Sequence, residues 1–166
     1  MMWLLGLIKI YLTIYNMKAV FILGSKVDME HTEKMVNGLT EWGIESDVHV
    51  ASAHKVPVKV LELVDGYNKE EDVVMIGVAG RSNALSGVLA ANSTHPVFAC
   101  PPFKDKDDMM VNLNSSLMMP SDTPVMTVVD PGNLVWSVVK IFGMKDIDLL
   151  TKIEAKMASI KESFNS

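Results

Sequence analysis

Three short polar segments of the sequence carry side chains that could bind an anion or move a proton. The first, Gly24–Asp28 (GSKVD), offers a glycine, a hydroxyl and a carboxylate. The second, Ser52–Lys55 (SAHK), places a histidine, which titrates near neutral pH, beside a lysine that could meet a phosphate or a carboxylate. The third, Ala79–Asn83 (AGRSN), contains Arg81, the one arginine of the chain. These residue types indicate acid–base chemistry on an anionic ligand.

Each segment also has a simpler structural interpretation. In the first, Ser25 could bond a phosphate and Asp28 the hydroxyls of a ribose, but Asp28 could equally cap the helix that follows. The histidine and lysine of the second segment could be solvated surface residues. In the third, backbone N–H groups could hold a small anion, or Ser82 or Asn83 could cap the next helix. Taken one at a time, the segments leave these alternatives open.

The remaining histidines and the cysteine are weaker candidates for catalytic residues. Cys100 lies in a CPPF segment with no basic residue before Lys104, which favours a rigid loop over a reactive thiol. His31 falls in a predicted helix, His49 within a predicted strand and His95 just before a proline. None of these histidines is placed as well for proton transfer as the one in the second segment. Neither a Walker loop nor a GxGxxG loop occurs in the chain.

Short apolar runs that alternate with amphipathic segments must position these residues. Strands are predicted at 18–23, 47–50, 73–78, 96–99 and 125–129. Helices are predicted at 29–42, 57–68, 84–91, within 104–121, at 131–142 and at 146–164. The alternation predicts an α/β fold, a three-layer, flavodoxin-like, doubly wound parallel sheet of about five strands with a C-terminal amphipathic helix. Ligands bind such sheets at the carboxyl ends of the strands, where all three polar segments fall.

Composition narrows the range of functions. The chain has 166 residues, of which 49% are hydrophobic and 21% charged, which fits one globular domain with a full core. Its net charge of −5 argues against a nucleic-acid binder that relies on bulk electrostatics. One cysteine excludes an intramolecular disulfide framework and a multi-cysteine metal site. Because arginine is scarce, phosphate binding must rely on lysine, hydroxyls or backbone N–H groups.

The two ends of the chain differ from the alternating region between them. Residues 1–16 are almost all apolar, but they are too few for a membrane span and lack the basic start of a secretory signal. We interpret them as an apolar extension that arises from a mis-assigned start, and a membrane-associating helix is the less favoured alternative. At the other end, the apolar stripe of residues 146–164 could pack on its own domain or cover a neighbouring subunit.

Taken together, the polar segments point to a protein family far more specifically than any one of them does alone. The order GSxxD, then SAHK, then GVAGRSNALSGVLAANSTHPVFACPPF resembles the 5-aminoimidazole ribonucleotide (AIR) carboxylase family of purine biosynthesis. The resemblance covers about residues 18–143. It implies a cytoplasmic enzyme that takes a small-molecule substrate without ATP, biotin or a metal and binds neither nucleic acid nor membrane.

Two positions resemble the class II branch, which is fused to a ligase domain in animals and free-standing in some bacteria. Class I members carry arginine after the loop histidine, where this chain has Lys55. They also carry a histidine in a GGAAHLPG loop, where the segment GRSNALSG of this chain places Ala84. Class I proteins are mutases of N5-carboxyaminoimidazole ribonucleotide, whereas class II proteins carboxylate AIR with CO₂ directly. The resemblance therefore implies a carboxylase, with the mutase and a non-catalytic nucleotide-binding module as alternatives.

The resemblance also implies roles for individual residues. His54 is expected to be the general acid/base that removes the proton from the imidazole carbon after CO₂ attaches. Ser25 and Asp28 are expected to bind the nucleotide, with Asp28 at the ribose hydroxyls. The other expected substrate-binding residues are Ser52 and Lys55, at a phosphate or carboxylate, and Gly80 and Ser82, against the ring and CO₂.

One departure from the family pattern bears on phosphate binding. Val27 stands where the family commonly has a second serine, and it has no hydroxyl to donate. Backbone N–H groups, Lys26 or Lys55 must then do more for the phosphate.

The family resemblance further implies a homo-oligomer, an octamer or a tetramer. The methionine-rich stretch 109–119 and the C-terminal helix are the expected contact surfaces. The expected organisation is an apolar extension (1–16), an AIR carboxylase domain (17–143) and a C-terminal helix (144–166), without a ligase partner.

Overall fold

The computed structural model of the chain describes residues 16–165, so the interpretation of residues 1–15 lies outside the described part. Its strands are β1 (Lys18–Leu23), β2 (Glu45–Val50), β3 (Val73–Val78), β4 (Val97–Ala99) and β5 (Met126–Thr127). Its helices are the 3₁₀ turn η1 (Lys26–Asp28), α1 (Met29–Glu41), α2 (Pro57–Tyr67), α3 (Ala84–Asn92), α4 (Lys106–Leu117), α5 (Pro131–Gly143) and α6 (Ile147–Glu162).

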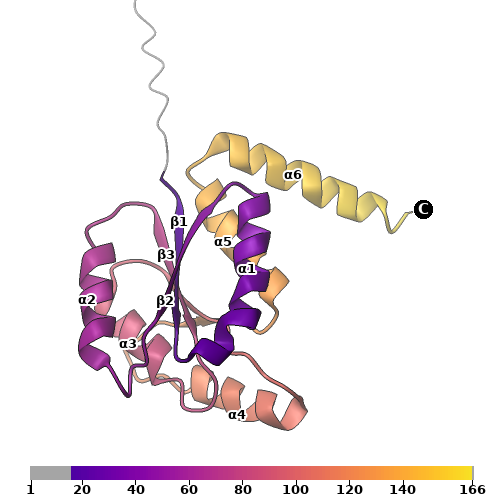
Figure 1. The fold of residues 1–166 in the computed structure, drawn as a ribbon. Coiled ribbons are helices and arrows are strands. Elements are labelled where there is room, and N and C mark those ends of the chain that lie inside the picture. The colour runs from indigo at the N-terminus through magenta and orange to yellow at the C-terminus, as the bar shows by residue number, and fades with distance from the viewer. Residues whose placement is uncertain (1–15, 166) are drawn as a thin grey trace, which may run out of the picture.

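The strands form one parallel sheet in the order β2-β1-β3-β4-β5. Helices α1 and α5 cover one face, and α2 and α3 cover the other (Figure 1). This strand order is typical of flavodoxin-like sheets, in which right-handed crossovers place helices on both faces. The predicted three-layer α/β fold is confirmed.

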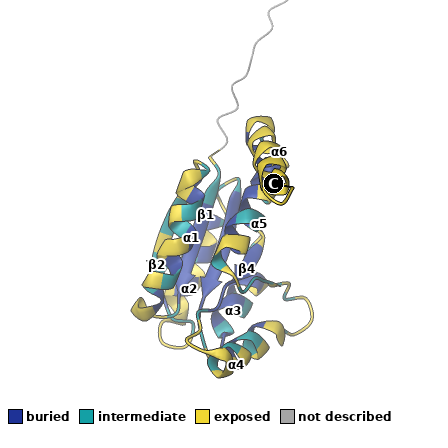
Figure 2. Cartoon of the chain, turned by 90° about the vertical axis from the view of Figure 1, so that its right-hand side faces the viewer, coloured by how far each residue is buried: buried dark blue, intermediate teal, exposed yellow. Residues whose placement is uncertain are grey.

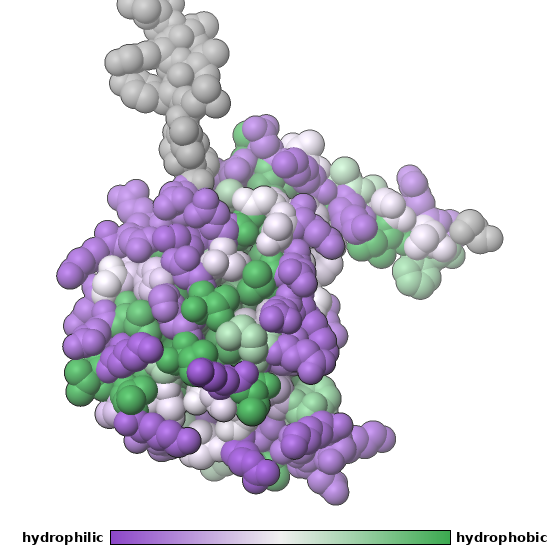
Figure 3. Space-filling model, in the orientation of Figure 1, coloured by the Kyte–Doolittle hydropathy of each residue, from purple (hydrophilic) through white to green (hydrophobic). Residues whose placement is uncertain are grey.

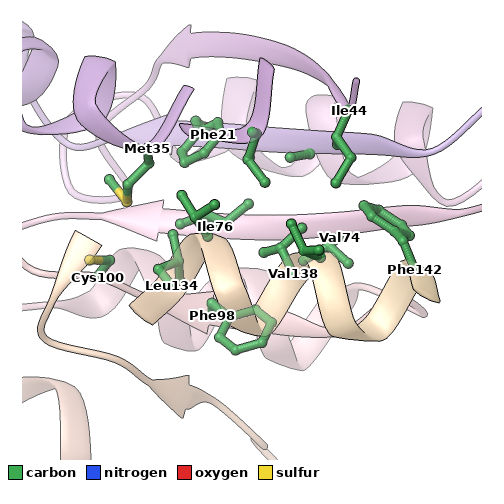
Figure 4. Packing of buried hydrophobic residues seen from close by; sticks show 14 of the residues in the cluster. Phe21, Met35, Ile44, Val74, Ile76, Phe98, Cys100, Leu134, Val138 and Phe142 are labelled. Atoms are coloured by element: carbon green, nitrogen blue, oxygen red, sulfur yellow. The ribbon is translucent and has the colours of Figure 1, made fainter. Parts of the chain in front are cut away.

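Strand β1 contributes to two hydrophobic cores because successive side chains point to opposite faces of the sheet. Ala19, Phe21 and Leu23 pack toward α1 and α5, whereas Val20 and Ile22 pack toward α2 and α3. Figure 4 shows the first core, in which side chains of the sheet meet those of α1 and α5. Central strands that are buried on both faces have nearly continuous apolar sequences. For this reason the predicted limits of β1 and β3 agree with the observed ones.

The edge strands differ from their predicted limits. Strand β2 begins at Glu45, two residues earlier than predicted, because its pairing with β1 extends to Lys18 while its side chains are polar. Strand β5 covers only Met126–Thr127. It pairs with β4, which is itself three residues long, and Pro124, two residues before β5, has no N–H to donate.

Helix ends follow the local capping chemistry. Gly43, after α1, has φ of 76°, so the predicted left-handed cap is confirmed. Pro57 opens α2 as predicted, where its missing N–H would have no helical partner. Helices α4 and α5 are capped by the side chains of Asp105 and Asp130, which accept from the backbone N–H groups of Asp108 and Asn133.

The C-terminal helix α6 packs on its own domain only near its start. Leu149 and Ile153 are buried against the core beside α5, while the rest of the helix projects away from the body (Figures 1 and 2). Met157, Ile160 and Phe164 are exposed, and Figure 3 shows hydrophobic surface on the projecting part. None of the helices within residues 16–165 has the length and apolarity to span a bilayer.

Candidate active site

The loops that follow β1, β2 and β3 meet at the carboxyl edge of the sheet and line a cavity of about 670 Å³. This volume is within the range of small-molecule sites. The cavity lies where a doubly wound sheet binds ligands, at the ends of neighbouring strands. All seven predicted site residues line it: Ser25, Asp28, Ser52, His54, Lys55, Gly80 and Ser82.

The first loop fixes the carboxylate of Asp28 by a reciprocal pair of hydrogen bonds. The Ser25 N–H donates to Asp28 Oδ2 at 3.0 Å, and Ser25 Oγ accepts from the backbone of the η1 turn, with the Val27 N–H at 3.5 Å. Asp28 precedes α1, but its side chain makes no cap bond there and reaches back to Ser25. Asp28 therefore occupies the N-cap position of α1 without a side-chain cap bond to that helix, and its carboxylate instead completes a capping box with Ser25 at the start of η1. Burial raises the pKa of Asp28, and the Ser25 N–H opposes that rise.

The second loop is a tight turn that carries His54 and Lys55 outward. The Ser52 carbonyl accepts from the N–H groups of Lys55 at 3.2 Å and Val56 at 2.9 Å. His54 and Lys55 are exposed and line the cavity. Their side chains can reach a ligand without paying a large desolvation penalty.

The third loop holds a residue in an unusual backbone conformation. Arg81 has φ of 58°, a left-handed geometry that is strained for a residue with a Cβ atom. Asn83 Oδ1 accepts from the Ser86 N–H at 3.1 Å, so Asn83, and not Ser82, caps α3. Ser82 stays exposed at the cavity.

Helix α1 supplies three cavity residues that the sequence interpretation did not name as site residues, Glu30, His31 and Lys34. His31 and Lys34 follow Asp28 by one and two helical turns, so they share its face and line the cavity. Burial, and then the charge of Lys34, lower the pKa of His31. The three-residue spacing from Asp28 was the signal that could have found His31 and Lys34. Of the two lysines expected to compensate for Val27, Lys55 lines the cavity and Lys26 does not.

The cysteine also has a basic neighbour that the sequence did not reveal. Cys100 Sγ lies 3.6 Å from His31 Nε2, although no basic residue is near it in the sequence. Cys100 is fully buried, and burial, with a smaller contribution from Asp130, raises the pKa of its thiol to about 12. The thiol therefore stays protonated, which agrees with a rigid loop rather than a reactive cysteine.

The cavity carries an excess of cationic side chains at its rim. Lys34, Lys55, Arg81 and Lys104 line it, against the acidic Glu30, Asp28 and Asp108. Such a lining can bind a phosphate or a carboxylate, and His54 can exchange a proton with a bound molecule. The arrangement suits a phosphorylated substrate and acid–base chemistry.

Comparison with known proteins agrees with this geometry. The family model described as AIR carboxylase matches residues 18–163. A phosphoribosylaminoimidazole carboxylase of Archaeoglobus fulgidus is 46% identical over 138 residues, 83% of this chain and 76% of the relative. An N5-carboxyaminoimidazole ribonucleotide mutase of Methanocaldococcus jannaschii is 41% identical over 134 residues, 80% of this chain and 83% of the relative.

A longer relative and a solved structure extend the comparison. A bifunctional phosphoribosylaminoimidazole carboxylase/phosphoribosylaminoimidazole succinocarboxamide synthetase of Drosophila melanogaster is 31% identical over 87% of this chain, which spans only 37% of that protein. The crystal structure of Treponema denticola PurE superposes with a TM-score of 0.82 and 31% identity, covering 89% of this chain and 93% of that one. The family match runs from β1 into α6 and so includes all three loops of the cavity. The chain belongs to the AIR carboxylase family.

Proposed function

We propose that this chain is a phosphoribosylaminoimidazole carboxylase, which converts AIR and CO₂ to 4-carboxy-5-aminoimidazole ribonucleotide in purine (IMP) biosynthesis without ATP. The observation that carries the proposal is the His54–Lys55 pair at the mouth of a cavity that the other two polar loops also line. A binding module needs no histidine beside its nucleotide, whereas a carboxylase needs a group that takes up a proton.

In the proposed reaction, the electron-rich imidazole carbon of AIR attacks CO₂ and a C–C bond forms. The proton on that ring carbon then passes to His54, and the ring regains its aromaticity. The reverse sequence, with His54 as the proton donor, is decarboxylation. Because the ring is already nucleophilic, the protein chiefly has to position the two reactants and accept the proton.

The nucleotide would be held by residues from the three loops. Asp28 Oδ2 is used by the Ser25 N–H, which leaves Oδ1 to accept from the ribose hydroxyls. Ser25, Ser52 and Lys55 would bind the phosphate or the new carboxylate. Gly80 and Ser82 would lie against the ring and CO₂, where the absence of a side chain at position 80 lets the backbone approach closely.

Two residues favour the carboxylase over the mutase. Lys55 follows the loop histidine where class I members carry arginine, and Ala84 stands where they carry a histidine. The higher identity to the A. fulgidus carboxylase, 46% against 41% for the mutase, points the same way.

The test is an assay of the purified chain with AIR and bicarbonate-derived ¹³CO₂, without ATP. We expect ¹³C to enter the carboxylated nucleotide. Turnover of N5-carboxyaminoimidazole ribonucleotide alone would contradict the carboxylase and identify a mutase. Turnover of neither compound, together with tight nucleotide or flavin binding, would identify a binding module.

A further inference from the structure

Helix α4 is joined to the third cavity loop by polar side chains more than 30 residues away in the sequence. The Asn83 N–H donates to Ser115 Oγ at 2.6 Å, and Asn83 Nδ2 donates to Ser116 Oγ at 2.9 Å. Ser116 Oγ in turn donates to the Asn112 carbonyl at 2.8 Å. Because buried polar groups need partners, α4 and the loop stabilise each other's conformation.

Asn112 makes the central contact of this group. Its side chain is buried, with 2% of its surface exposed. Oδ1 accepts from the backbone N–H of Arg81, and Nδ2 donates to the Pro102 carbonyl at 2.7 Å. A carboxamide carries an acceptor and a donor on one flat group, so this residue can join the loop of Arg81 and the segment of Pro102 at once.

The contact coincides with the strained and crowded part of the third loop. Arg81 is in the left-handed conformation, and its N–H is the group that Asn112 binds. A Cβ atom on Gly80 would lie 3.1 Å from Asn112 Nδ2, so the loop backbone lies directly on the amide. A left-handed residue with a Cβ persists only where its surroundings hold it, and Asn112 provides that support.

We propose that Asn112 is a positioning residue of the reaction. It holds the Arg81 backbone in its left-handed conformation and thereby keeps Gly80 and Ser82 against the imidazole ring and CO₂. The effect on the reaction rests on the proposed function, whereas the effect on the loop does not. Because the ribose and phosphate are bound by the other two loops, loss of Asn112 reduces kcat and leaves the KM for the nucleotide near its original value.

Two variants separate positioning from mere folding. Asn112→Ala removes both contacts. Asn112→Asp keeps an oxygen for the Arg81 N–H but turns the second oxygen toward the Pro102 carbonyl, where two acceptors repel. The matched control is Asn114→Ala, an exposed asparagine on the same helix. Ser115→Ala, which removes the acceptor for the Asn83 N–H, is a milder variant on a partly exposed position.

The experiment measures amide hydrogen exchange of Arg81 and steady-state kinetics for each full-length variant. We expect Asn112→Ala to lose the protection of the Arg81 amide and to reduce kcat by about 100-fold with little change in KM, because small misplacement of reacting groups has effects of that size. Asn112→Asp should keep more Arg81 protection, Ser115→Ala should show a smaller fall in kcat of the same kind, and Asn114→Ala should match the parent chain.

Three outcomes would overturn the inference. The first is unchanged hydrogen exchange of the Arg81 amide in Asn112→Ala. The second is that Asn112→Ala has the same kcat and KM as Asn114→Ala. The third is that a rise in KM alone accounts for the whole loss of kcat/KM in Asn112→Ala. If Asn112→Ala does not fold, the same criteria apply to Asn112→Asp and Ser115→Ala, with the Asn83 amide as the probe for Ser115→Ala. A parent chain inactive with both nucleotides contradicts the proposed function alone, because Arg81 exchange still decides whether Asn112 holds the loop.

Discussion

The charged side chains at the two edges of the sheet differ in whether they form ion pairs. At the amino edge, Lys18 Nζ lies 2.9 Å from a Glu70 carboxylate oxygen and 3.3 Å from Asp47 Oδ2. The Tyr67 hydroxyl donates to the same Asp47 oxygen at 2.9 Å and contacts His49 Nε2 at 2.7 Å. Each of these groups has its partner within the chain, so this edge contributes to stability.

At the carboxyl edge, four basic side chains line the cavity without a direct ion pair in the described part of the chain, although acidic residues line the same cavity. Lys34, Lys55, Arg81 and Lys104 all line it, and within residues 16–165 the structure contains no ion pair for any of them. The basic side chains around the cavity are thus available to an anionic ligand, and substitutions at the two edges should separate activity from stability.

The largest effect is expected for His54→Asn. Asparagine cannot take up the proton, so we expect kcat to fall roughly 100- to 10,000-fold, the range that general acid–base catalysis supplies. Nucleotide affinity, measured by calorimetry, should stay near that of the parent chain. Equal loss of turnover and affinity would make His54 a structural residue.

Next in size is Asp28→Asn. The amide oxygen can still accept from the Ser25 N–H, so the loop should keep its shape, but the ribose hydroxyls lose a charged acceptor. We expect the KM for the nucleotide to rise roughly 10- to 100-fold, since a hydrogen bond to a charged group contributes about 1.5–3 kcal/mol. Because burial raises the pKa of Asp28, its ionised form is disfavoured in the fold and removal of the charge should not lower the thermal midpoint near neutral pH. A lowered midpoint with unchanged KM would contradict a ligand role.

A smaller loss is expected for Lys55→Met. Lys55 is exposed, so its interaction with a phosphate is partly screened by solvent, and we expect KM to rise about tenfold at low salt and less at high salt. The control is Lys69→Met, an exposed lysine at the opposite edge, which should leave KM unchanged. An equal change of KM in Lys55→Met and Lys69→Met would show that Lys55 has no special role in binding the phosphate.

The carboxyl-edge part of this contrast could be predicted from the sequence, because apolar strands and the polar loops that follow them are recognisable from neighbouring residues alone. Strand β3 is an uninterrupted apolar run and β1 is apolar after Lys18, and a parallel sheet brings the loops after them to one edge. The seven predicted cavity residues all lie in three such loops. The edge strand β2 was placed less well, because Glu45 and Ser46 have no apolar pattern and take their conformation from pairing with β1.

The residues that sequence reasoning missed depend on contacts across the fold. Asn112 reaches Arg81 from 31 residues away, and nothing local marks a buried asparagine in a polar helix. Likewise, His31 and Cys100 are 69 residues apart and meet only when α1 packs beside the end of β4. The amino-edge network of Lys18, Asp47 and Tyr67 was not foreseen for the same reason.

The smallest effect on function, and one confined to stability, is expected for Tyr67→Phe. The variant loses the hydroxyl that donates to Asp47, so we expect the free energy of unfolding to fall by about 1 kcal/mol near neutral pH, with kcat and KM unchanged. Burial by itself would raise the pKa of Asp47, but the hydrogen bonds from Tyr67 and Lys18 outweigh it and hold that pKa below its ordinary value.

A lowered pKa in the fold means that this stability is present above the unfolded value of about 3.9 and disappears as the pH falls through the folded value. The gap in unfolding free energy between the parent chain and Tyr67→Phe should therefore narrow below about pH 4. Urea unfolding at acidic and neutral pH measures this gap. A gap that stays constant would contradict a contribution through the ionised Asp47 carboxylate. A loss of turnover as large as that of Lys55→Met would show that the amino edge does more than stabilise the fold.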